Sequence, residues 1–248
     1  MFDSATDTVR SSSIDPVEKY VDFFNDLCAP DQIFEAFRDQ VREKSPARAK
    51  VIGALWYHLS EAIVDVLCVA LAKLETPQIR HLVAQTVYEE LGEASPDQIH
   101  TDLLRQMLRV ADVTDVDILR YSGHKGINAA IDGLMGRLHA CQSDAEVCGL
   151  LLGMELIAYQ NVDNVIDYLS YDSEIGTAVS DTPWARLHHQ LEEGHIRRAV
   201  SIFVDHVTAL HDQRQFTKSF MATMRFWDEF WSTIAAEATG RPLAVSTE

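Results

Sequence analysis

Residues 188–195 read His188-His189-Gln190-Leu191-Glu192-Glu193-Gly194-His195, which is a His-x3-Glu-x2-His pattern. Because each residue of an α-helix turns by about 100°, His188, Glu192 and His195 fall within about 40° of one line along a helix. Apolar residues such as Trp184 and Ile202 continue the same face, so these polar groups interrupt a stripe that should face the core. Burying two imidazoles and a carboxylate requires partners, and a first-row transition metal is one candidate.

The composition is that of an acidic globular protein. Hydrophobic residues make up 47% of the 248 residues, enough for a substantial core and too many for a disordered chain. The net charge of −17 argues against nucleic acid or an anionic membrane as a partner, because phosphate groups require a basic surface. No uninterrupted apolar run approaches a membrane span, and residues 1–15 lack the features of a signal peptide, so we expect a soluble cytoplasmic protein.

Pairs of a capping residue and proline predict where helices begin, because proline fits the first helical position. They are Asp15-Pro16, Ser45-Pro46, Thr76-Pro77, Ser95-Pro96 and Thr182-Pro183. The expected helices cover residues 16–27, 32–43, 46–74, 77–91 with Gly92 as its cap, a segment after Ser95, 127–140, 143–171, 183–210 and 216–238. No segment shows the alternation of a strand. We therefore expect an all-α single domain of seven or more helices at residues 15–240, between flexible segments at 1–14 and 241–248.

Three more residues with metal-binding side chains are expected to face the core. Glu155 lies in the apolar run Leu150–Ile157, where an ionised carboxylate needs a cation or, alternatively, a buried Arg or Lys. Helical phase turns Glu90 inward and leaves Glu89 at the edge of the apolar stripe. His100 follows on the next helix and would count for little alone. Together with residues 188–195 they make six inward groups, the kind of set that holds two metal ions in helical bundles.

This set resembles the haem-oxygenase-like dimetal oxidases and oxygenases, a family that shares the seven-helix fold of haem oxygenase, TenA and PqqC but carries a diiron centre. The family pattern is a Glu, a His on the next helix, a mid-chain Glu and a final His-x3-Asp-x2-His. The matching residues, over roughly residues 47–231, are Glu90, His100, Glu155, His188, Glu192 and His195. Glu192 departs from the pattern, since it stands where the family usually has Asp.

The resemblance implies metal ligation by these six residues, with two Fe(II) ions (or Mn) as cofactor and O2 as co-substrate. Some family members add a carboxylate from the third helix, which Glu61 or Asp65 could supply, and Glu89 is a further candidate ligand. The alternative for Glu61 and Asp65 is a solvated strip on an amphipathic helix.

The family's reactions include N-oxygenation, oxidative cleavage of amino-acid side chains and fatty-acid decarboxylation. Polar side chains expected on inward or near-inward positions favour a small amino-acid-derived substrate, oxidised by N-oxygenation or by C–C or C–N cleavage in specialised-metabolite (natural product) biosynthesis. These candidate substrate-contacting residues are His58, Tyr159, His206 and Arg225. A dimetal fatty-acid decarboxylase remains an alternative.

A helical bundle could also carry out a different function. A metal-independent enzyme like TenA or PqqC would leave the six inward groups unexplained, and Cys68, Cys141 and Cys148 have no evident catalytic partner. A true haem oxygenase needs a proximal histidine, and residues 15–43 contain none. A storage bundle would show repeated ferroxidase signatures, which are absent. The aromatic-rich C-terminal helix suggests a homodimer.

Overall fold

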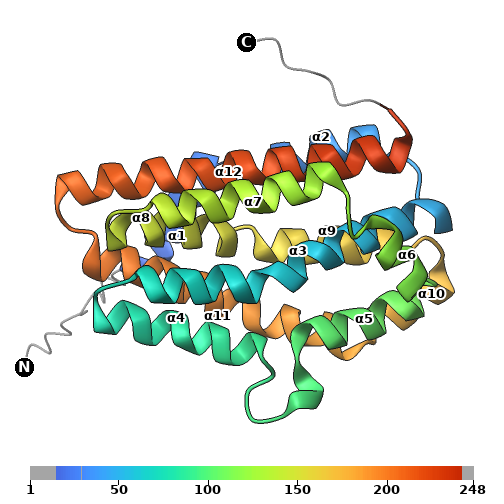
Figure 1. The fold of residues 1–248 in the computed structure, drawn as a ribbon, viewed down its shortest axis with the longest axis horizontal. Coiled ribbons are helices and arrows are strands. Elements are labelled where there is room, and N and C mark those ends of the chain that lie inside the picture. Colours follow the sequence, from blue (N-terminus) through green and yellow to red (C-terminus); the bar gives the residue numbers. More distant parts are fainter. Residues whose placement is uncertain (1–14, 29, 242–248) are drawn as a thin grey trace, which may run out of the picture.

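The computed structural model describes residues 15–28 and 30–241, and within these ranges the chain is helical with no strand (Figure 1). The expected flexible segments at 1–14 and beyond 241 lie outside the described residues. The helices are α1 Pro16–Cys28, α2 Pro30–Gln40, α3 Pro46–Lys73, α4 Pro77–Glu90, a 3-10 turn Pro96–Gln98, α5 His100–Val110, α6 Asp115–Tyr121, α7 Lys125–Ala140, α8 Asp144–Glu155, α9 Ala158–Leu169, α10 Ser173–Ser180, α11 Pro183–His206 and α12 Leu210–Thr239. The all-α single-domain prediction is confirmed, with more helices than seven.

The proline-marked starts are confirmed for α1, α3, α4 and α11, each of which begins at its proline. At α3 the Ser45 side chain accepts a hydrogen bond from the Arg48 amide, and at α11 Thr182 does the same for Ala185. These side chains satisfy amide groups that have no partner inside the helix. Local capping interactions therefore fix where α3 and α11, the two long helices beside the candidate site, begin.

The expected single helix over 143–171 is wrong, because the chain breaks into α8 and α9 at Leu156–Ile157. No proline or glycine marks this break, so tertiary packing rather than local propensity sets it. The helices α6 and α10 lie in segments where none was expected, and Pro96 opens a 3-10 turn before α5. α11 ends at His206, whereas its end was expected at residue 210. α12 begins at Leu210, whereas its start was expected at residue 216.

α3 runs through the middle of the bundle, where it contacts α4 to α9 and α12 (Figure 1). Contrary to expectation, α3 is long and apolar enough by length and composition to cross a membrane; no other helix of the described residues is. Its packing gives another reason for that composition, since a helix covered on several sides is apolar around most of its circumference.

α12 buries its aromatic face inside the chain, against α2, α3, α7 and α8. Its buried aromatic residues are Phe216, Phe220, Phe226, Trp227, Phe230 and Trp231. The suggestion of a homodimer rested on these residues. Because they are part of the core, they offer no exposed surface to a second subunit.

α8 and α12 approach closely at glycine. A Cβ atom built on Gly149 would lie 2.2 Å from the Phe216 carbonyl oxygen, and one on Gly153 would lie 2.6 Å from the Thr223 Cβ. Backbone atoms cannot move aside as a flexible side chain can. The two glycines therefore let α8 lie close enough to α12 for Glu155, at the end of α8, to reach its position.

Gly149→Ala is expected to lower the free energy of unfolding by about 3 kcal/mol, because α8 and α12 must separate. Gly136→Ala on α7 is the matched control. A Cβ there meets nothing within 4 Å, and alanine favours a helix by up to about 1 kcal/mol over glycine. Urea unfolding of both variants measures the difference. Equal urea midpoints for the two variants would contradict the close approach of α8 to α12 at Gly149.

Candidate metal centre

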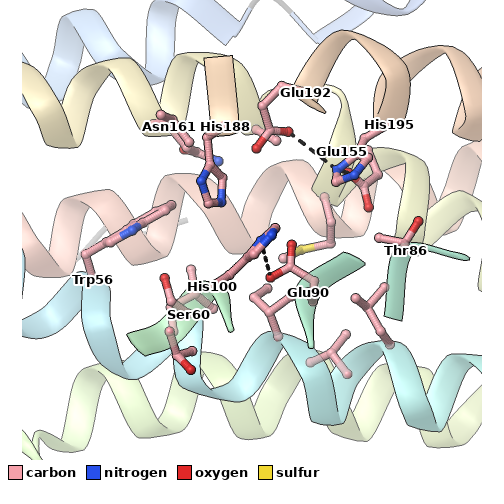
Figure 2. A pocket seen from close by; sticks show the side chains of 18 of the residues that line it. Trp56, Ser60, Thr86, Glu90, His100, Glu155, Asn161, His188, Glu192 and His195 are labelled. Carbon is pink, nitrogen blue, oxygen red and sulfur yellow. Dashed lines mark ion pairs between the residues drawn. The ribbon is translucent and has the colours of Figure 1, made fainter. Parts of the chain in front are cut away.

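A cavity of about 100 Å³ lies between α3, α4, α5, α8, α9, α11 and α12 (Figure 2). All six predicted ligands line it. The other polar lining residues are Ser60, Thr86, Thr101 and Asn161. Most of the remaining wall is apolar, with the rings of Trp56, Trp184 and Trp227 among it. The structure thus brings the six groups, from α4, α5, α8 and α11, to one cavity.

Glu90, His100 and His188 form the first trio, in which one ligand atom from each lies within 4.8 Å of the others. Glu90 is the last residue of α4, and Gly92 (φ +83°) then reverses the chain so that α5 can begin with His100. His100 Nδ1 lies 3.0 Å from Glu90 Oε2. His188 Nδ1 lies 3.0 Å from the Trp184 carbonyl oxygen, so it carries the proton it donates and leaves Nε2 with a free lone pair.

Glu155, Glu192 and His195 form the second trio, again with ligand atoms within 4.8 Å of one another. His195 Nδ1 lies 3.6 Å from Glu155 Oε2 and 3.9 Å from Glu192 Oε2. The break after α8 matters here, since Glu155 is the last residue of that helix. The trio combines two carboxylates with one imidazole, whereas the first combines two imidazoles with one carboxylate.

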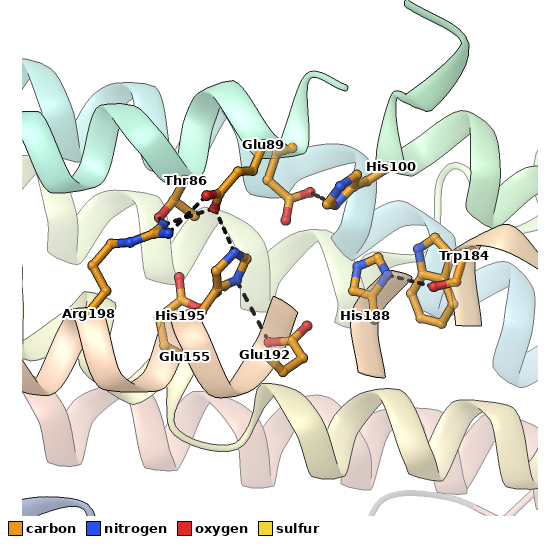
Figure 3. A network of polar contacts seen from close by, with 10 residues as sticks. Thr86, Glu89, His100, Glu155, Trp184, His188, Glu192, His195 and Arg198 are labelled. Atoms are coloured by element: carbon orange, nitrogen blue, oxygen red, sulfur yellow. Dashed lines mark hydrogen bonds and ion pairs between the residues drawn. The ribbon is translucent and has the colours of Figure 1, made fainter. Parts of the chain in front are cut away.

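Glu89, expected as a further candidate ligand, is the hydrogen-bond partner of His195 (Figure 3). Its Oε2 lies 2.9 Å from His195 Nε2, and both its oxygens accept from Arg198 at 2.9 Å. Burial alone would raise the pKa of Glu89, but the Arg198 guanidinium outweighs it and lowers that pKa. A charged Glu89 holds the proton of His195 on Nε2 and turns Nδ1 toward the second trio, as partners of metal-bound histidines commonly do.

The ionisation of the cavity groups is strongly perturbed. Burial and the neighbouring Glu155 carboxylate raise the pKa of Glu192 to about 8. Burial acts against the charged form of His195, but Glu155, Glu192 and Glu90 outweigh it and raise that pKa to about 10. Burial lowers the pKa of His188 to about 4, so its imidazole is neutral. Without a metal, the protons held by Glu192 and His195 offset the negative charge of the second trio.

The residues fit a pair of first-row transition metal ions. Glu192 is 4% exposed, and its Oε2 has no hydrogen-bond partner among the described residues. The His195 ring lies 3.9 Å away, too far for a hydrogen bond, and a metal ion beside this oxygen would satisfy it. Three imidazoles and three carboxylates are the mixed donor set that suits iron and manganese.

The other residues singled out from sequence do not line the cavity. Glu61 and Asp65 are exposed, in agreement with a solvated strip. The inward positions expected for Arg225 and His206 are wrong, since both side chains are exposed.

Two further candidates are held elsewhere. Tyr159 is 41% exposed beside His189, and a ring nitrogen of His58 lies 3.0 Å from the Ile118 carbonyl oxygen. The cavity instead contains Asn161 and Trp56, which sequence reasoning missed. The available signal for Asn161 was a polar residue on the apolar face of Ala158, Val162 and Val165.

Comparison with known proteins agrees with this geometry. A sequence profile of the family described as iron-containing redox enzymes matches residues 54–228, and the chain belongs to this family. No curated protein matches the sequence significantly. A CADD-like protein of unknown function from Nostoc punctiforme has a similar structure, with TM-score 0.69, 13% identity and coverage of 93% of this chain and 97% of that one.

A TenA homolog from Pseudomonas syringae pv. tomato is also similar, with TM-score 0.63, 14% identity and coverage of 94% and 98%. At these identities the likeness establishes the fold, which is haem-oxygenase-like as the resemblance implied. The family match adds that this fold belongs here to an iron-containing redox enzyme.

Glu89→Gln is expected to weaken metal binding by about 10-fold or more, because His195 loses a charged hydrogen-bond partner and Arg198 loses its counter-ion. Arg197→Gln is the matched control on α11, since Arg197 pairs only with Asp15 and Glu18 among the described residues, at the surface. Competition with a chelator under anaerobic conditions measures the affinity. Equal affinities in the two variants would show that Glu89 does not support the site.

Proposed function

We propose that the protein is an O2-dependent non-haem diiron oxidase or oxygenase, in which the two trios hold the two ions. The observation that carries the proposal is the convergence of three imidazoles and three carboxylates on one cavity, where a buried Glu192 oxygen accepts no hydrogen bond from the described residues. When bound, the iron pair would supply the activation of O2 that the oxidation needs.

The chain's own residues hold and shield such a centre. Three carboxylates offset part of the charge of two divalent ions, and Arg198 with Glu89 fixes the orientation of His195. The Trp184 ring lies over His188, with ring centroids 4.1 Å apart. This ring and the apolar lining cover part of the first trio, and such cover limits side reactions at an oxidising site.

The proposed substrate is a small amino-acid-derived molecule, oxidised by N-oxygenation or by C–C or C–N cleavage. His58, Tyr159, His206 and Arg225 give this preference no support, because they lie outside the cavity. The support comes from the polar side chains that line the cavity. Ser60, Thr101 and Asn161 provide polar contacts within it.

Anaerobic titration with Fe(II) tests the proposal. We expect two ions to bind per chain and to quench tryptophan fluorescence, since Trp56, Trp184 and Trp227 line the cavity. Admission of O2 should then consume oxygen in proportion to bound iron, and Mn(II) loading shows whether manganese can substitute. Binding of fewer than one ion per chain, or oxygen consumption independent of bound iron, would overturn the proposal.

A further inference from the structure

Trp56 carries a buried hydrogen-bond donor that nothing in the described structure uses. The residue is 7% exposed and lines the cavity, and its Nε1 has no hydrogen-bond partner among the described residues. Two neighbouring indoles are satisfied: Trp227 Nε1 donates to the Gly153 carbonyl oxygen at 3.0 Å and Trp231 Nε1 to Asn161 Oδ1 at 2.9 Å. An unpaired buried N–H group is rare and costly, so a ligand that accepts from it would be bound favourably.

Asn161 carries a second unused donor on the same wall. It is 1% exposed, and its Nδ2 has no partner among the described residues. The orientation of the amide follows from its neighbour, because an indole N–H can only donate and must therefore face Oδ1. This leaves the NH2 group as the free end of a side chain that lines the cavity.

Trp231 contacts both residues that carry the donors. Its ring stacks on Trp56 with centroids 5.8 Å apart, and its N–H bonds to Asn161. Figure 2 shows Trp56 and Asn161 on the same side of His188, away from Glu155 and His195. Both donors thus lie at the end of the cavity that the first trio occupies.

The surroundings favour an oxygen that accepts hydrogen bonds. Asn161 lies in the first turn of α9, whose amino end has no side-chain cap and whose first residue, Ala158, lines the cavity. The amino end of a helix carries partial positive charge. No Lys or Arg lines the cavity, so polar recognition at this wall comes from neutral donors.

We propose that Trp56 Nε1–H and the Asn161 amide NH2 are substrate-positioning groups that receive a carboxylate or carbonyl oxygen of the substrate beside the first metal trio. The inference rests on the proposed function for its placement, since it assigns the substrate's acceptor end to one wall of that site. An ammonium group is excluded from the same wall, because two N–H donors cannot accept its hydrogen bonds.

The test uses the full chain, metal-free and loaded with redox-inert Zn(II), and three matched probes: butanoate, butanamide and butylammonium. Ligand-observed NMR titration measures the dissociation constants. We expect butanamide to bind both forms and butanoate to bind the Zn(II) form best, because the ions offset the carboxylates of the trios. In the Zn(II) form butylammonium should bind at least about 10-fold more weakly than butanamide.

Trp56→Phe removes the unused N–H and keeps an aromatic ring, and Asn161→Asp removes the NH2 group while keeping an acceptor for Trp231. Each should weaken butanamide binding about 10-fold. The matched control is Tyr168→Phe, which removes a buried O–H that already donates to the Val41 carbonyl oxygen and lies outside the cavity. We expect this control to lower the urea midpoint without changing the ratio of butanamide to butylammonium affinity in the Zn(II) form, whereas Trp56→Phe should change that ratio.

Equal binding of the three probes by the Zn(II)-loaded wild-type protein would overturn the inference. Butanamide affinities of Trp56→Phe and Asn161→Asp that lie within twofold of the wild-type value would overturn it as well. The butanamide measurement on metal-free protein tests the donor pair independently of the proposed diiron function. Loss of that binding in the two variants supports the donor pair even if iron fails to bind. Stoichiometric iron binding with unchanged butanamide affinity in the variants would leave the metal centre in place and reject the donor pair.

Discussion

His188→Ala is expected to retain one of two metal ions and to lose at least about 100-fold in the rate of O2 consumption, because an open first trio keeps only Glu90 and His100. The second trio shares no residue with the first, so it should still bind. Metal analysis after anaerobic Fe(II) loading, followed by oxygen-electrode measurements, gives both quantities.

Two other histidines of α11 sharpen this experiment. His195→Ala should remove the other ion, and the double variant should bind neither. His189→Ala is the matched control, since His189 is exposed, faces Tyr159 and Asp163, and should retain both ions. Two ions per chain in all the single variants would show that the trios do not hold the metal.

Metal affinity is expected to rise steeply between pH 6 and pH 8, with at least one proton released per chain on loading at pH 7. In the metal-free protein Glu192, with a pKa of about 8, and His195, with a pKa of about 10, both hold protons at pH 7. A metal ion must displace these protons, so each one released makes the affinity rise about tenfold per pH unit below the corresponding pKa. His188, with a pKa of about 4, releases none in this range.

Calorimetric titration in buffers of different ionisation enthalpy counts the protons released. Glu192→Gln should release fewer protons than the wild type, because its amide cannot ionise, whereas Glu193→Gln, an exposed neighbour, should behave as the wild type does. Affinities that are the same at pH 6 and pH 8 would contradict the assignment of protons to the second trio.

Much of the fold could be predicted because its determinants are local. The starts of α1, α3, α4 and α11 follow from capping residues and prolines, and Gly92 adopts the positive φ that ends α4. The break between α8 and α9 could not be predicted. It lies three residues past Gly153, which is itself helical, so the local sequence does not mark the break and the helices packed around it decide where the chain turns.

The six inward groups were predicted from helical phase and apolar surroundings, and the structure places them on one cavity. Their ligation of metal stays a prediction. The positions of His206 and Arg225 were predicted wrongly because periodicity gives the face of a helix but not how far neighbouring helices cover it. His206 is the last residue of α11, where that cover ends.

By itself the sequence determined the helical class, the proline-marked helix starts and the inward phase of the candidate ligands, because these depend on backbone sterics and on the 3.6-residue period. The support of His195 by Glu89 and the unused donors of Trp56 and Asn161 become visible only in the folded chain. These roles depend on contacts between distant segments, such as Arg198 with Glu89, 109 residues apart. Local sequence patterns carry no information on which helices will face each other at that separation.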